Sequence, residues 1–126
     1  MGRLPICWLS KKQTIVATST TEAEYVSTSE CIKKVLWIWN IIKELFNKEK
    51  EITIYTDNLS SKITMENGDL NTRLKHINIK FHFDKDNIDN HKINLKYINT
   101  ENMIADILTK DVNGSKMSMF TNHIFN

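Results

Sequence analysis

The chain has 126 residues, of which 40% are hydrophobic and 25% are charged, which is the size and composition of one globular domain. Its formal net charge of +2 is far below that of a protein that binds nucleic acid through charge alone. No stretch approaches the roughly 18 apolar residues of a membrane span, and no signal-peptide pattern follows Met1, so we expect an intracellular protein that is neither secreted nor membrane-bound.

The two cysteines, Cys7 and Cys31, lack the spacing of metal ligands. Without a secretory signal a disulfide between them is disfavoured, because the cytosol keeps thiols reduced. We therefore expect two buried free thiols, the usual state of an unpaired cysteine.

The first half of the chain predicts two short strands followed by a long helix. Residues 6–9 and 14–17 are apolar runs with strand composition. Ser19, Thr20 and Thr21 are candidate N-caps, and Thr21 with Glu24 has the spacing of a capping box, which begins a helix. The periodic segment that follows predicts a helix from about residue 22 to residue 46, ended by the polar and charged residues 47–50.

The second half of the chain alternates strands and helices. Residues 51–56 and 93–98 alternate apolar and polar side chains, as half-buried strands do. Helices are expected over residues 60–65, 74–90 and 101–110, and a looser turn or helix after Gly114. This order of elements predicts a mixed α/β fold.

The long helix is expected to present Glu24, and not Glu22, to the core. Residues three or four apart on a helix share a face. Steps of this size from Glu22 meet several polar residues, whereas steps from Glu24 meet a mostly apolar stripe made of Thr28, Cys31, Val35, Ile38 and Ile42. We therefore expect Glu24 at the buried edge of the first turn and Glu22 in solvent.

Three acids, Glu24, Asp57 and Asp106, stand at the boundaries of predicted elements or interrupt an apolar helix. Each has a local explanation when it is taken alone. Glu24 can stabilise the N-terminus of its helix, Asp57 can belong to an Asx turn with Asn58, and Asp106 can be an exposed residue of an amphipathic helix. Because ligands bind where the strands of an α/β sheet give way to helices, we expect the three carboxylates to converge.

Carboxylates that lie within a few ångströms of one another repel unless a cation neutralises them. Magnesium prefers oxygen ligands, and a set without His or Cys is poorly suited to zinc. We therefore expect Glu24, Asp57 and Asp106 to be catalytic ligands of Mg²⁺, as one or two ions, with Mn²⁺ able to substitute. Two such ions can activate water and stabilise the leaving oxygen during phosphodiester hydrolysis.

Five short sequence motifs occur in order along nearly the whole chain. They are residues 6–13 (ICWLSKKQ), 19–25 (STTEAEY), 54–58 (IYTDN), 75–79 (KHINI) and 105–110 (ADILTK). Together they resemble the ribonuclease H domain of copia-type LTR retrotransposon polyproteins. The resemblance implies a ribonuclease H-like mixed sheet with flanking helices, dependence on Mg²⁺, and hydrolysis of the RNA strand of an RNA–DNA hybrid. It assigns metal ligation to Glu24, Asp57 and Asp106.

The resemblance also implies where the chain acts and what it meets. Its partners would be the RNA–DNA hybrid and the upstream reverse transcriptase region of the same polyprotein, in a cytoplasmic retrotransposon particle or the nucleus. Lys11, Lys12 and Lys75 are expected to lie near the phosphates of the hybrid. Solvated surface is the alternative for each lysine.

The family begins with two further strands, and the first of these carries another metal-binding acid that residues 1–4 do not supply. We therefore expect one partial ribonuclease H-like domain over residues 1–126 that lacks the first two strands, is inactive as an isolated chain, and has residues from about 112 loosely attached. One alternative is a non-catalytic remnant that at most binds nucleic acid or a protein partner through an open sheet edge. Another is a chain too small to fold by itself.

Overall fold

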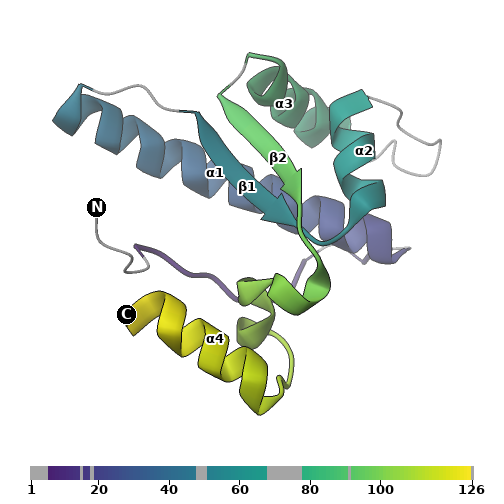
Figure 1. The fold of residues 1–126 in the computed structure, drawn as a ribbon. Coiled ribbons are helices and arrows are strands. Elements are labelled where there is room, and N and C mark those ends of the chain that lie inside the picture. Colours follow the sequence, from purple (N-terminus) through teal and green to yellow (C-terminus); the bar gives the residue numbers. More distant parts are fainter. Residues whose placement is uncertain are drawn as a thin grey trace. The chain divides into compact units, whose positions relative to one another are not determined.

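The structure is a computed structural model that describes residues 6–14, 16–17, 19–47, 51–67, 78–90 and 92–125. Its elements are helices α1 (Thr20–Phe46), α2 (Leu59–Asn67), α3 (Asn78–Asp89) and α4 (Gly114–Phe125), strands β1 (Ile52–Thr56) and β2 (Ile93–Tyr97), and 3₁₀ helices η2 (Thr100–Asn102) and η3 (Ile104–Leu108) (Figure 1). The fold is therefore mixed α/β, as the order of elements predicted. None of the described helices is long and apolar enough to cross a membrane.

The chain divides into two compact units. The larger unit is Ala17–Tyr97, which contains α1, β1, α2, α3 and β2. The smaller unit joins Met1–Val16 to Ile98–Asn126 and contains η2, η3 and α4.

Helix α1 confirms the predicted long helix, and its N-cap is the first of the three candidates and not Thr21 of the capping box. The N-cap is Ser19, whose Oγ accepts a hydrogen bond of 3.1 Å from the backbone N–H of Glu22. Ser19 and Glu22 thus have the same spacing as the predicted pair, two residues upstream. At the other end Asn47 adopts a left-handed conformation, with φ of 47°, and donates its N–H to Lys43 O.

The buried face of α1 is not the one that the sequence predicted. Its buried residues are Glu22, Tyr25, Val26, Thr28, Ser29 and Ile32. Glu22 is 0% exposed, whereas Glu24 is only half-buried, so the assignment of Glu24 to the core and Glu22 to solvent is wrong. Of the stripe traced from Glu24 only Thr28 is buried, and Cys31 is exposed. Val26 and Ser29, which lie on the Glu22 face, are buried instead.

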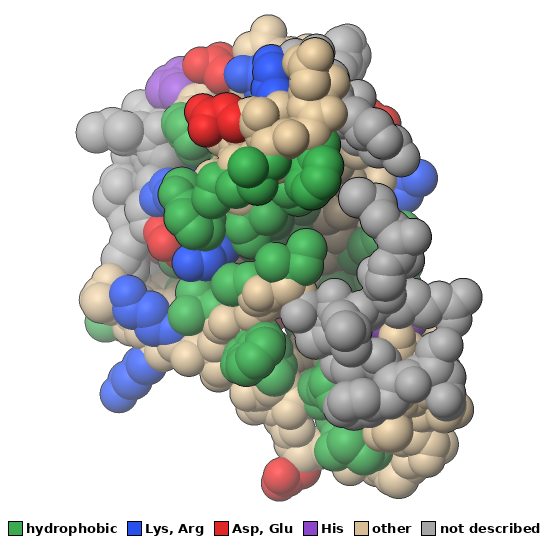
Figure 2. Space-filling view, turned by 90° about the vertical axis from the view of Figure 1, so that its left-hand side faces the viewer, with side chains coloured by type: hydrophobic (Ala, Val, Ile, Leu, Met, Phe, Trp, Pro, Cys, Tyr) green, Lys and Arg blue, Asp and Glu red, His purple; other side chains and the backbone are tan. Residues whose placement is uncertain are grey.

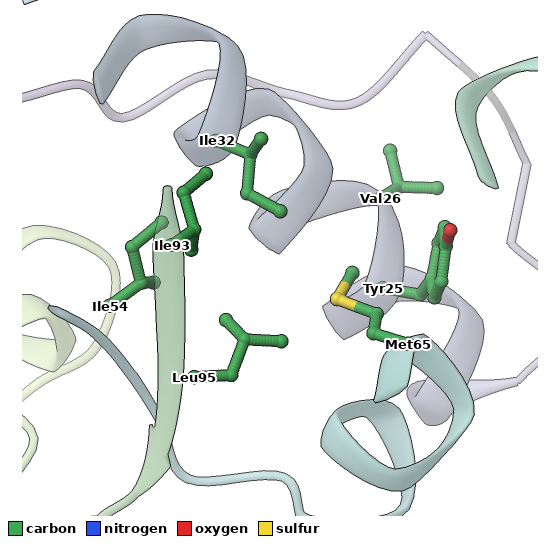
Figure 3. Packing of buried hydrophobic residues seen from close by; sticks show 7 residues of the cluster. All are labelled: Tyr25, Val26, Ile32, Ile54, Met65, Ile93 and Leu95. Atoms are coloured by element: carbon green, nitrogen blue, oxygen red, sulfur yellow. The ribbon is translucent and has the colours of Figure 1, made fainter. Parts of the chain in front are cut away.

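The sheet consists of β1 and β2, which pair in parallel with Ile54 opposite Leu95. Both strands were predicted. Their inward side chains pack against α1 and α2, and Figure 3 shows the apolar cluster that results: Tyr25, Val26, Ile32, Ile54, Met65, Ile93 and Leu95. This core belongs entirely to the larger unit.

Helices α2 and α3 connect the two parallel strands. Asn58 caps α2, because its Oδ1 accepts a hydrogen bond of 2.8 Å from the backbone N–H of Ser61. Helix α3 confirms part of the helix predicted over residues 74–90, and residues 74–77 of that prediction lie outside the described residues. Tyr25 of α1 donates its hydroxyl hydrogen to Asp84 Oδ2 of α3 at 3.4 Å, and both residues are buried.

Two predicted strands are absent. Residues 6–9 and the described residues of the run 14–17 have no strand conformation. Ile6, Trp8, Leu9 and Val16 are exposed. A strand is stable only when a neighbour completes its backbone hydrogen bonds, and in the described part of the chain β1 and β2 pair only with each other.

The expectation of two buried cysteines is also wrong. Cys7 and Cys31 are both free and exposed. Cys31 lies on α1 but outside its buried face, one residue before the buried Ile32.

In the smaller unit the helix predicted over residues 101–110 is replaced by the short 3₁₀ helices η2 and η3. The backbone N–H of Asp106 bonds to Met103 O at 3.3 Å, and that of Thr109 bonds to Asp106 O at 3.0 Å. These are the three-residue steps of a 3₁₀ helix. Helix α4 then begins after Asn113, whose Oδ1 accepts a hydrogen bond from the N–H of Lys116.

Candidate functional site

Two of the three predicted acids lie in the larger unit. Glu24 is half-buried in the first turn of α1, where its backbone carbonyl accepts a hydrogen bond of 2.9 Å from Thr28 Oγ1. Asp57 is half-buried and follows β1 directly. It therefore stands at the carboxyl edge of a parallel strand pair, the edge at which open α/β sheets usually bind ligands.

The third acid, Asp106, lies in η3 of the smaller unit and is only 8% exposed. Its two oxygens are bonded to two different lysines. Lys110 Nζ donates to Oδ1 at 2.9 Å, and Lys116 Nζ donates to Oδ2 at 2.8 Å. Burial by itself raises the pKa of Asp106, but the hydrogen bonds and positive charges of Lys116 and Lys110 outweigh burial, so the pKa lies below its ordinary value.

Lys116 is an unusually buried lysine, with a side chain only 13% exposed. Besides its bond to Asp106 it donates a hydrogen bond of 2.6 Å to the backbone carbonyl of Thr100. The ammonium group thereby ties the first turn of α4 to both 3₁₀ helices. Nothing in the sequence predicted this role of Lys116, because no spacing pattern links it to an acid ten residues away in another element.

The contact between Asp106 and Lys110, in contrast, had a sequence signal. The two residues are four apart, the separation at which opposite charges meet on a helix. Because η3 ends at Leu108, the pair forms here at the end of a 3₁₀ helix. The local alternative for Asp106, an exposed residue of an amphipathic helix, is wrong.

Asp106 is a buried, ionised carboxylate that binds two ammonium groups, so its surroundings favour positive charge. A divalent ion would have to displace one of the two ammonium groups to bind there. Among the described residues no group of three or more His, Cys, Asp or Glu side chains is placed to hold a metal ion. The convergence of Glu24, Asp57 and Asp106 on Mg²⁺ stays a prediction.

Of the three lysines predicted to contact phosphates, the structure describes two. Lys11 and Lys12 are exposed and line an open hollow of the smaller unit, together with Ser10 and residues 107–111. Lys75 lies outside the described residues.

The chain is similar to short parts of transposon polyproteins. It is 35% identical over 114 residues, 90% of its length, to "Retrovirus-related Pol polyprotein from transposon TNT 1-94" of Nicotiana tabacum. It is 32% and 31% identical, over 98% of its length, to the Pol polyproteins of transposons RE1 and RE2 of Arabidopsis thaliana. The chain is homologous to a segment of these transposon Pol polyproteins.

The homologous segment is short. The chain spans only 8% to 9% of the length of these curated relatives. The same similarity extends, at 28% identity over 90% of the chain, to Ty1 Gag-Pol polyproteins of Saccharomyces cerevisiae. No family model matches the chain. No solved structure matches it.

Proposed function

We propose that the chain is the ribonuclease H region of a copia-type retrotransposon Pol polyprotein, which hydrolyses the RNA strand of RNA–DNA hybrids. The observation that carries the proposal is the similarity of 90% to 98% of the chain to Pol polyproteins. The five sequence motifs, which include all three predicted acids, support the finer assignment to ribonuclease H.

In this proposal the residues of the chain orient a metal site and keep its ligands charged. Asp57 supplies a carboxylate at the carboxyl edge of β1, and Glu24 supplies another from the first turn of α1. Lys110 and Lys116 keep Asp106 ionised. Bound Mg²⁺ would activate water and stabilise the leaving oxygen of the phosphodiester. A fourth acid would come from the preceding region of the polyprotein, next to its reverse transcriptase.

Cleavage of a labelled RNA–DNA hybrid in Mg²⁺ tests this function. The chain is assayed alone and fused to the polyprotein segment that precedes it in a relative, and Asp57→Asn is the matched inactive variant. We expect the fusion to cut only the RNA strand and the Asp57→Asn fusion to lose activity by several powers of ten, because catalytic groups that act as a unit fail together. A folded fusion without any activity would refute the ribonuclease assignment.

A second candidate function is a non-catalytic remnant that binds a protein partner. Helix α1 favours it, because Trp37, Ile41 and Leu45 form an apolar stripe at four-residue steps and are 59%, 38% and 71% exposed. Figure 2 shows hydrophobic side chains at the surface in several places on the face that it draws. Exposed apolar patches of this kind often mark interaction sites. This function predicts that partner binding survives Asp57→Asn and Asp106→Asn but is lost in Trp37→Ser.

A further inference from the structure

The smaller unit has a hollow of about 570 Å³ that is open to solvent. Two distant segments of the chain form it. One segment contributes Ser10, Lys11 and Lys12, and the other is the stretch 107–111 that ends η3 and follows it. These segments lie almost a hundred residues apart in the sequence, so no local motif predicts the hollow.

The chemistry of the hollow is that of an anion site. Three lysines line it, Lys11, Lys12 and Lys110, against one acid, Asp111. Ser10 and Thr109 add hydroxyl groups, which are good donors to phosphate oxygens. Lys110 contacts Asp106 but keeps 56% of its side chain exposed, so it can also face a ligand.

The shape and lining favour a nucleic-acid backbone over a small ligand. A small molecule usually needs an enclosed, mostly apolar pocket, whereas this hollow is open and lined mainly by polar groups. No aromatic residue belongs to the described lining, so a base has nothing to stack on. Ammonium and hydroxyl groups bind backbone phosphates without regard to sequence.

We propose that this hollow binds the backbone phosphates of a nucleic-acid strand through Lys11, Lys12 and Lys110, with Ser10 and Thr109 as additional donors. The inference rests on the proposed function only in taking nucleic acid as the ligand. It adds Lys110 and the two hydroxyl residues to the lysines expected from the sequence. It also brings the bound strand next to Asp106, because Lys110 contacts both the hollow and Asp106 Oδ1.

The test is binding of a fluorescently labelled RNA–DNA hybrid to the full chain, measured by anisotropy at several salt concentrations. EDTA is present, so that binding is measured without cleavage. The double variant Lys11→Gln and Lys12→Gln is compared with wild type and with the matched control Lys33→Gln and Lys34→Gln, an exposed lysine pair on α1. We expect the Lys11→Gln and Lys12→Gln variant, called the hollow variant, to bind the hybrid more weakly than wild type, and the control variant to bind it as tightly as wild type. The slope of log K against log salt for the hollow variant should fall by about one for each lysine.

The outcomes separate the inference from the proposed function. Equal weakening in both double variants, or no weakening in either, overturns the hollow as the binding site. Displacement of the hybrid by low millimolar inorganic phosphate, but not by chloride of equal ionic strength, would make the hollow a small-anion site and also overturn it. The two proposals can fail separately. If only the hollow variant loses binding and the folded fusion never cleaves the hybrid, the hollow is supported as the binding site and the ribonuclease function is refuted.

Discussion

At the scale of single residues, loss of the Lys116 side chain should destabilise the smaller unit. Replacing Lys116 by Met leaves the buried Asp106 with one lysine in place of two and leaves the Thr100 carbonyl without this donor. We expect a loss of about 1–3 kcal/mol in the free energy of unfolding at pH 7. Urea unfolding followed by circular dichroism measures it. The exposed lysine Lys33, paired with Glu30, is the control, and Lys33→Met should cost less than about 1 kcal/mol.

The stabilisation by Lys116 should depend on pH. The pKa of Asp106 in the folded chain lies below its ordinary value of 3.8, so its contribution to stability is present above that value. It is lost as the pH falls through the lower pKa of the folded chain, because protonation removes the negative charge that the lysines bind. The difference between wild type and Lys116→Met should therefore shrink in acid. A difference that stays constant from pH 7 to pH 2 would contradict this account.

Tyr25 should titrate unlike an exposed tyrosine. Burial first, and then the charge and hydrogen bond of Asp84, raise the pKa of Tyr25 well above its ordinary value of 10.0. Because the unfolded chain ionises at that ordinary value, the stability that this group contributes is present below pH 10 and is lost as the pH rises above it. In a spectrophotometric titration at alkaline pH, wild type should show a late tyrosine step that Tyr25→Phe lacks. If Tyr25→Phe instead loses amplitude from the ordinary tyrosine step and keeps any later step, Tyr25 ionises normally and this account is wrong.

At the scale of elements, the start of α1 is decided by Ser19. Because Ser19 Oγ accepts the N–H of Glu22, Ser19→Ala should lower the free energy of unfolding by about 1 kcal/mol. Thr21→Ala is the matched control, since Thr21 lies inside the helix and should cost less than about 0.5 kcal/mol. Thermal melts of the two variants compare them directly. If Thr21→Ala destabilised the chain more than Ser19→Ala, Thr21 would be the N-cap, as its capping-box spacing with Glu24 suggested.

The elements differ in how far the sequence predicts them, and the reason is physical. Helix α1 and the strands β1 and β2 have regular periodicity, which is a local property. The face of α1 could not be found in the same way, because Glu22 is buried by what packs around it and not by its own helix. Residues 6–9 have strand composition, but a strand also needs a partner. Lys116 meets Asp106 only through the fold, whereas the spacing of Asp106 and Lys110 could be found in advance.

At the scale of the whole molecule, the proposed metal site combines acids that lie far apart in the sequence, Glu24, Asp57 and Asp106. A ligand that binds only the folded chain stabilises it, by about 2.7 kcal/mol at a concentration one hundred times its dissociation constant. If the three acids share metal ions, Mg²⁺ or Mn²⁺ should therefore raise the melting temperature of the chain, or of its fusion with the preceding segment.

The same melts on acid variants decide whether the shift comes from the three acids. Asp57→Asn and Asp106→Asn should each abolish most of it, because each removes a ligand from a shared site. Asp86→Asn is the control, since Asp86 is an exposed acid of α3 outside the set, and it should keep the full shift. If the metal no longer raised the melting temperature of Asp86→Asn but still raised that of Asp57→Asn, the metal would be binding to surface charge and not to the three acids. Loss of the shift in both Asp57→Asn and Asp106→Asn, with the full shift kept in Asp86→Asn, would support a metal site that contains both acids.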